Sequence, residues 1–362
     1  LFGRSVTFTA TVAVTAPGAA ATTGTVTFFD GTTALATVAV SGSTASFTTA
    51  GLAPGAHAVT ARYSGTAGLA GSTSAARTVT VGFSSPCITT ASSKALTVES
   101  GQAACVGAGG TVKSSVTVKQ GGSLYVSGGS ITGSVTTTGA TAVTICKATV
   151  GGSISVFGST GFVLIGDGTS ACGANTLKSY LTAASNTGGI EVAGNTFSGP
   201  VTLTNNSGSG PLPGQRIPIV RANTITGNLS CTGNVPGVDD VGNKASSYSG
   251  QCTLTGTSVS VAASPSGGTV ATGQPVTFTA TLAFTGSTVP TGTVSFTDGG
   301  APLAGCASVP VSARTAGSTT VYSAACTVTW TDSGYHSVTA AYSGDTRLAP
   351  SVSAVPVAVT VA

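Results

Sequence analysis

The side chains that could carry acid–base chemistry in the middle of the chain are few. Residues 83–254 contain five carboxylates: Glu99, Asp167, Glu191, Asp239 and Asp240. Two carboxylates held a set distance apart, one of them protonated, can hydrolyse a glycosidic bond. Glu191 and Asp239 are the best candidates, because they occupy the same place in the repeat described below. Asp239 and Asp240 also stand in the polar segment NVPGVDDVGN, and the more ordinary interpretation is a solvated loop.

The two histidines offer little nucleophilic chemistry. His57 and His336 begin matching segments, HAVTARYSG and HSVTAAYSG, and this repetition indicates a structural role. Asp332 precedes His336 by four residues, but Ala53 stands at the matching place, and no G-x-S-x-G turn supplies a serine. The cysteines lack the CxxC spacing of a metal site. We therefore expect no catalytic residue, no metal and no cofactor.

A repeat of about 20 residues would position the carboxylates. Its phrase is a small residue, an apolar residue, two or three small or polar residues, and then an apolar–polar–apolar triplet. Copies begin at residues 91, 111, 130, 149, 176, 196, 224 and 243. Such self-similarity is typical of a solenoid, in which each turn buries its apolar face against its neighbours. For residues 83–254 we predict a right-handed parallel β-helix of about eight turns.

Each predicted turn contains two strands. The phrase supplies one, and the second is predicted at SLYV (123–126), AVTI (142–145), FVLI (162–165) and GIEV (189–192). Asn175, Asn195 and Asn223 each precede a phrase by one residue, where stacked asparagines can form an amide ladder. Glu191 and Asp239 lie two turns apart in this register. That separation is about 10 Å, near the range of inverting glycosidases.

The cysteines repeat in step with the phrase. Neighbouring strands lie about 4.8 Å apart, within the span of a disulfide. We therefore predict that disulfides join adjacent turns, and that a fourth joins two strands of a hairpin near the C-terminus. The predicted pairs are Cys87–Cys105, Cys146–Cys172, Cys231–Cys252 and Cys306–Cys326. Eight paired cysteines in a chain without methionine indicate an oxidising compartment.

The two ends of the chain are copies of each other. GRSVTFTATVAVT (3–15) matches GQPVTFTATLAFT (273–285), and TGTVTFFDG (23–31) matches TGTVSFTDG (291–299). Short alternating strands between turn signals favour antiparallel β-sandwiches, in which we expect Tyr63, Tyr342 and Trp330 to pack. If Trp330 were exposed, it could stack on a sugar.

The repeated phrases of the two ends resemble the bacterial immunoglobulin-like repeat family. The resemblance implies Ig-like sandwiches at residues 1–82 and 255–362. In that family such domains are stalks and spacers of secreted and surface proteins, sometimes adhesive and not usually catalytic. The middle of the chain, with NTITGNLSCTGN at 223–234 and GQC at 250–252, is similar to the secreted β-helix segments of actinobacterial proteins.

The copies differ by one strand. TSVSVAAS (257–264) precedes Gly273 in the second copy, whereas the first copy begins two residues before the matching Gly3 and lacks this strand. One explanation is that the chain is an excerpt of a longer tandem array. The other is that another subunit donates the strand, because an open edge favours aggregation unless something pairs with it.

The composition narrows the classes of partner. Charged residues are 6% of the chain, and the net charge of +4 is spread without a basic cluster. This argues against nucleic acid or an anionic membrane as a partner. No apolar run reaches the length that spans a membrane, so we expect a secreted or surface-attached extracellular protein.

Our first hypothesis for the function is an extracellular structural protein without catalytic activity: a stalk, fibre or filament subunit of the bacterial cell surface. Its three units could extend end to end, and it would associate with copies of itself or with further Ig-like repeats. A second hypothesis is an adhesin or lectin-like protein that binds surface glycans. The binding site would be the flank of the helix or the loops 166–175 and 207–218, the two insertions that lengthen the repeat. A remote alternative is a polysaccharide-active enzyme on the β-helix.

Overall fold

The structure of the chain is a computed structural model, and it describes most of the 362 residues. The described residues are 1–15, 18, 22–168, 171–208, 217–235, 237–253, 255–266, 268–284, 289–316, 319–345 and 348–362. Within this part the elements are β-strands, apart from a short 3₁₀ helix at Gln251–Thr253. No helix in the described ranges is long and apolar enough to cross a membrane.

The middle of the chain is a parallel β-helix, as predicted. The copies of the phrase stack in the expected register: Thr111 pairs with Ala91 on one side and with Ser130 on the other, and Thr176 pairs with Thr149 and Thr196. The first sheet of the β-helix has 14 strands. They are β8 (Ala91–Ser92), β9 (Leu96–Val98), β11 (Thr111–Val112), β12 (Val116–Val118), β14 (Ser130–Ile131), β15 (Val135–Thr138), β17 (Thr149–Val150), β18 (Ile154–Phe157), β20 (Thr176–Leu177), β21 (Leu181–Ala184), β23 (Thr196–Phe197), β24 (Val201–Thr204), β26 (Thr224–Thr232) and β27 (Lys244–Gly250).

The second sheet of the β-helix is formed by the other predicted strand of each turn. It has six parallel strands: β10 (Ala103–Val106), β13 (Ser123–Ser127), β16 (Ala142–Cys146), β19 (Val163–Asp167), β22 (Ile190–Ala193) and β25 (Ile219–Arg221). Valine, isoleucine and leucine side chains from both sheets fill the core between them. Because alternate residues of a strand point to opposite faces, the polar residues between these apolar ones point away from the core.

Two columns of buried amides run along the β-helix. In the predicted column, Asn175 Nδ2 donates to Asn195 Oδ1 (2.8 Å), Asn195 donates to Asn223 (3.0 Å), and Asn223 donates to Asn243 (2.9 Å). A second column was not predicted. It contains Asn186, Asn206, Asn234 and Gln251, joined in the same way at 2.7–3.0 Å. The column amides also bond to backbone groups, so these buried polar side chains are satisfied.

Four disulfides join the eight cysteines. Cys87–Cys105, Cys146–Cys172 and Cys231–Cys252 link neighbouring turns of the β-helix, with Cα–Cα distances of 4.5, 4.8 and 5.3 Å. Cys306–Cys326 lies in the C-terminal sandwich, with a Cα–Cα distance of 5.8 Å. All four distances lie within the usual span of a disulfide.

Antiparallel sandwiches flank the β-helix. The N-terminal one pairs β1 (Val6–Thr11) with β4 (Thr44–Thr49) against a sheet of β2 (Thr25–Asp30), β3 (Thr33–Ala39), β5 (Gly55–Tyr63), β6 (Ser72–Thr73) and β7 (Arg77–Val81). In the C-terminal one, the first sheet contains β28 (Thr257–Ser264), β30 (Pro275–Phe284), β34 (Ser312–Ala316) and β35 (Thr319–Thr329). The second contains β29 (Thr269–Val270), β31 (Thr293–Asp298), β32 (Ala301–Pro302), β33 (Val309–Pro310), β36 (Gly334–Tyr342), β37 (Ser351–Val352) and β38 (Val357–Val361).

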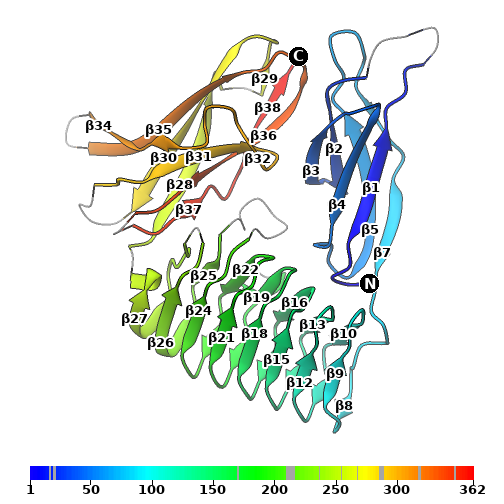
Figure 1. Cartoon of the computed structure of the whole chain (residues 1–362), viewed down its shortest axis with the longest axis vertical. Helices are drawn as coiled ribbons and strands as arrows, with labels where there is room; N and C mark the ends of the chain where they lie inside the picture. The colour runs from blue at the N-terminus through cyan, green and yellow to red at the C-terminus, as the bar shows by residue number, and fades with distance from the viewer. Residues whose placement is uncertain are drawn as a thin grey trace.

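The three units do not follow one another in a line, and the expectation that they extend end to end is wrong for this structure. Both sandwiches lie on the side of the β-helix that carries the six-stranded sheet, and they stand next to each other (Figure 1). The N-terminal one is anchored by Phe2, which packs against Phe83 and Tyr125. The sandwiches touch where Ser333 Oγ donates to the Gly65 carbonyl at 3.1 Å. These contacts between units involve residues outside the stacked repeats, such as Arg4, whose guanidinium donates to the Gly101 carbonyl.

Candidate functional site

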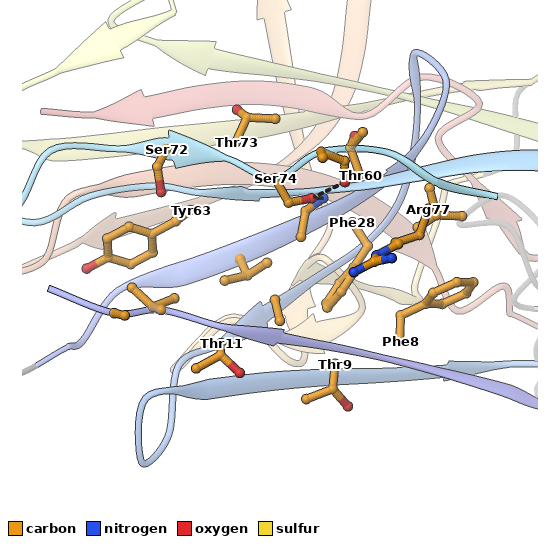
Figure 2. A pocket seen from close by; sticks show the side chains of 17 residues that line it. Phe8, Thr9, Thr11, Phe28, Thr60, Tyr63, Ser72, Thr73, Ser74 and Arg77 are labelled. Atoms are coloured by element: carbon orange, nitrogen blue, oxygen red, sulfur yellow. Dashed lines mark hydrogen bonds between the residues drawn. The ribbon is translucent and has the colours of Figure 1, made fainter. Parts of the chain in front are cut away.

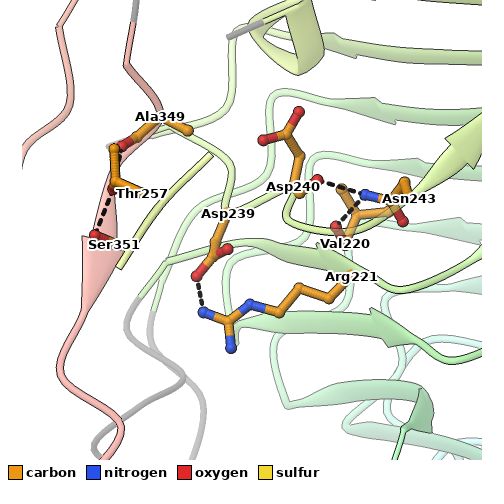
Figure 3. A network of polar contacts seen from close by, with 8 residues as sticks. All are labelled: Val220, Arg221, Asp239, Asp240, Asn243, Thr257, Ala349 and Ser351. Carbon is orange, nitrogen blue, oxygen red and sulfur yellow. Dashed lines mark hydrogen bonds and ion pairs between the residues drawn. The ribbon is translucent and has the colours of Figure 1, made fainter. Parts of the chain in front are cut away.

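The predicted carboxylate pair lies in the expected register but is joined to a cation. Glu191 pairs with Ile219, and Ile219 in turn bridges Asp239, which places the two carboxylates two turns apart. Asp239 is 1% exposed and forms an ion pair with Arg221 (Figure 3). Burial lowers the pKa of Arg221, and the nearby charge of Glu191 opposes that effect. A buried, ion-paired aspartate is poorly placed to exchange a proton with a polysaccharide. The ion pair is better suited to holding two neighbouring turns of the β-helix together.

Asp240 is the neighbouring carboxyl group, and it turns away from Arg221 (Figure 3). Burial raises its pKa to about 7, and its Oδ1 has no hydrogen-bond partner among the described residues. The turn that holds it packs against the C-terminal sandwich at Gly237. The space there is so small that a Cβ atom on this residue would lie 2.8 Å from the ring of Pro350. The predicted solvated loop is therefore a contact between two units.

The histidines support the turns of the two sandwiches. His57 Nδ1 lies 2.6 Å from Asp30 Oδ2, and His336 Nδ1 lies 2.6 Å from Asp298 Oδ2. Both aspartates belong to the matching Asp-Gly turns of the repeated phrase. Burial lowers the pKa of His57, but its hydrogen bonds to Asp30 and to the Ala53 carbonyl raise it, with a net increase. The same pair in both copies fits the structural role expected for these histidines.

The aromatic candidates pack as expected. Tyr63 and Tyr342 are buried, and their hydroxyls donate to the Thr23 carbonyl (2.6 Å) and to Asp345 Oδ2 (2.8 Å). Trp330 is half-buried and stacks on His336, with ring centroids 4.0 Å apart. One face of the tryptophan is therefore occupied by a protein ring, which leaves less surface for a sugar.

The N-terminal sandwich contains an open groove along β1, which we call the edge groove (Figure 2). Its volume is about 500 Å³. One wall is residues 8–13, which belong to β1 and the two residues after it, and the other is formed by residues 59–61 of β5, residues 72–75 and Arg77. β1 pairs with β4 on one side, and no described strand pairs with its other side. The groove therefore combines a strand edge that no described strand covers with a partly apolar slot.

The C-terminal sandwich fills the matching place with β28. That strand pairs antiparallel with β30 and also contacts β36, β37 and β38. Under it, Ser351, Val352 and Ser353 are 1%, 7% and 1% exposed. The matching residues of the N-terminal sandwich are all exposed; they are Ser72, Thr73 and Ser74. The edge groove is thus the space that a strand occupies in the other copy.

A second cleft lies between the N-terminal sandwich and the β-helix. Its volume is about 640 Å³, and it is lined by Phe47 and the segment 48–54 on one side and by Tyr125, Phe162 and Leu164 on the other. Asp167, Ala171 and Cys172, from the first inserted loop, border it. Of the second predicted recognition loop, residues 209–216 lie outside the described residues.

Comparisons with known proteins identify the two ends. The sequence profile of the bacterial Ig-like domain (group 3) matches residues 1–82 and 261–362, which together make up just over half of the chain. Searches of curated proteins and of solved structures found no match. The matched ranges are the two sandwiches, and they flank the β-helix. The chain therefore belongs to the bacterial Ig-like domain (group 3) family.

Proposed function

We propose that the chain is an extracellular structural protein, a stalk, fibre or filament subunit of the bacterial cell surface, without catalytic activity. The observation that carries this proposal is the way in which the turns of the β-helix are held together. Backbone ladders, two amide columns and three disulfides connect each region of the helix to the next turn. Cross-links of this kind slow unfolding, which is the form of stability that matters outside the cell.

The family and the disulfides suit this setting. A bacterial Ig-like domain suggests a surface or extracellular role, and four disulfides persist in an oxidising environment. With 6% charged residues, neighbouring chains would repel one another little, which favours close packing between copies. The proposed partners are therefore further copies of the chain or further Ig-like repeats.

Glycan binding, as in an adhesin, is the second candidate because of the cleft beside the first inserted loop. The half-buried ring of Phe162 lines this cleft, and Thr144 and Thr160 add hydroxyl groups. Aromatic faces with nearby hydroxyls are suited to sugar rings.

Sedimentation of the purified chain separates the two candidates. A structural subunit should form large species as its concentration rises without any added ligand, and reduction of its disulfides should abolish both the assemblies and their resistance to denaturant. A glycan-binding module should stay small and should be stabilised against heat by its glycan. Phe162→Ala should remove that stabilisation, whereas Phe157→Ala, at an exposed ring elsewhere on the helix, should not.

A further inference from the structure

We propose that one flank of the β-helix, which we call the lysine ridge, binds an acidic polysaccharide, a polymer whose sugars carry carboxylate groups. The ridge consists of the short strands that begin each copy of the phrase, together with the bends on either side of them. Five exposed lysines stand on it: Lys94, Lys113, Lys147, Lys178 and Lys244. The inference goes beyond the proposed structural role, and it can hold whether or not the chain forms fibres.

The stacking of the turns brings these lysines together from distant parts of the sequence. Lys113 and Lys178 directly follow the short strands β11 and β20, and Lys94 lies in the bend after β8. Lys147 lies shortly before β17, and Lys244 is the first residue of β27. All of these strands belong to the 14-stranded sheet, whereas the sandwiches lie on the side of the six-stranded sheet (Figure 1). The charges are spread along the sequence, but the fold gathers them on one uncovered flank.

No described carboxylate balances the ridge. None of its five lysines forms an ion pair with a described residue, whereas Lys119, in a bend on another side of the helix, pairs with Glu99 at 2.8 Å. The other acids of the β-helix belong to the six-stranded sheet or are buried; they are Asp167, Glu191, Asp239 and Asp240. The ridge therefore presents charge of one sign, which attracts an anionic partner.

The spacing of the lysines suits a polymer that carries few charges. The ladder from Lys94 to Lys244 runs from β8 to β27 in seven steps, or about 34 Å at about 4.8 Å per strand. The ridge thus has one cation for roughly every 8 Å of its length. Duplex DNA carries one phosphate charge per about 1.7 Å, which is far denser. A polysaccharide with separated carboxylates matches the ridge better, and several weak contacts along one polymer add up.

Hydroxyl groups between the lysines can bind the sugars themselves. The first residue of the short strand is a threonine or a serine in successive turns, which pair in register: Thr111, Ser130, Thr149, Thr176, Thr196 and Thr224. Each is exposed or half-buried, and none of these hydroxyls forms a hydrogen bond to another described residue. A hydroxyl both donates and accepts, so it can pair with the hydroxyls of a sugar while the lysines meet its carboxylates.

Protection of the lysines from chemical acetylation tests this proposal. The full chain is mixed with polygalacturonate, and mass spectrometry measures the acetylation of each lysine with and without the polymer. The control polymer is methyl-esterified polygalacturonate, which keeps the sugars but lacks the free carboxylates. Two double variants are compared by calorimetry: Lys113→Gln with Lys178→Gln on the ridge, and Arg62→Gln with Lys119→Gln, which removes the same charge from exposed residues elsewhere.

We expect polygalacturonate to protect the five ridge lysines and to leave Lys119 reactive, and we expect the methyl ester to protect none. The ridge variant should bind polygalacturonate roughly fivefold more weakly than the unchanged chain, because two exposed ion pairs are lost. The variant of Arg62 and Lys119 should bind as tightly as the unchanged chain. Binding should also weaken as the salt concentration rises, since salt screens exposed charges.

Four results would overturn the proposal. Equal acetylation of the ridge lysines with and without polygalacturonate would remove the site. Equal protection by the methyl ester would show that carboxylates are not recognised. Equal weakening in the two double variants would show that the ridge has no special part in binding. Protection by a DNA duplex but not by polygalacturonate, at about 0.15 M salt, would assign the ridge to nucleic acid. Fibres formed by a chain that fails these tests would leave the structural role standing and exclude only this surface.

Discussion

Ser353 is 1% exposed, whereas Ser74, its counterpart in the N-terminal sandwich, is open to solvent. Both hydroxyls accept the same backbone hydrogen bond, so the difference is not in local structure. It arises because β28 covers one serine and no described strand covers the other. Within the described residues, the two copies of one domain therefore differ by one covering strand.

The cover that β28 provides should be essential to the C-terminal sandwich. Val259 is buried and faces the core, so Val259→Asp should place an unpaired carboxylate in apolar surroundings and cost roughly 3 kcal/mol. Ser260→Asp changes the next, exposed residue of the same strand and should cost little. Hydrogen exchange of β36 measures both effects. Equal protection of β36 in the two variants would show that β28 does not close this core.

The disulfide Cys146–Cys172 should stabilise the β-helix by constraining the unfolded chain. It spans 26 residues of sequence, for which the chain-entropy model gives about 3.5 kcal/mol. Replacing both cysteines by alanine should lower the denaturant concentration at which the β-helix unfolds. Hydrogen exchange of the backbone amides in its strands measures this midpoint. The matched control replaces Cys306 and Cys326, which lie in the C-terminal sandwich. An equal loss of β-helix stability in that control would contradict a local effect.

The amide columns should contribute as connected networks. Asn206→Ala removes the acceptor of both Asn186 Nδ2 and the backbone N–H of Asn186. Leaving such buried donors without partners costs about 1–3 kcal/mol each, so for the two donors we expect a loss of roughly 2–6 kcal/mol in the stability of the β-helix. Asn228→Ala removes a bond to Ser249 and one from Ser247 on the solvent-accessible flank, where water can replace them, and should cost about 1 kcal/mol. Similar losses of stability in the two variants would contradict the claim that the column amides contribute more than hydrogen bonds on the flank of the helix.

Asp240 should make stability fall as the pH rises. Its pKa is raised to about 7 in the folded protein, above the ordinary value of about 4 in the unfolded chain. Between pH 4 and pH 7 the folded state therefore holds up to one more proton than the unfolded state. The stabilisation that results is complete below about pH 4 and is lost as the pH rises to about 7. The slope is about 1.4 kcal/mol per pH unit at most. Asp240→Asn should flatten it in unfolding curves measured from pH 4 to 8, and an unchanged slope would contradict the assignment.

The sequence predicted the β-helix well because its signal is periodic. Thr111, Thr176 and Thr224 begin copies of one phrase, and parallel stacking puts their strands in one sheet without further information. The second amide column had a comparable signal, since Asn186 and Asn206 are spaced like Asn175 and Asn195. It was missed because these residues follow the strand of the phrase instead of preceding it.

Other features depend on contacts that no repeat encodes. Arg221 lies between the predicted carboxylates because the side chains of successive turns meet there, and this turned the candidate acid Asp239 into a buried ion pair. The placement of the sandwiches beside each other rests on single residues such as Phe2 and Ser333. Neither residue stands out in the sequence, because its partner comes from a distant part of the chain.

Electron microscopy of the protein as its native cells release it tests the proposed structural role most directly. The account predicts regular filaments or fibres whose axial repeat matches the length of one chain or of a small array of chains. Reduction of the disulfides should destroy them. Isolated particles of the size of a single chain, at concentrations equal to those at the cell surface, would contradict the structural role and would favour glycan binding at the cleft beside the N-terminal sandwich.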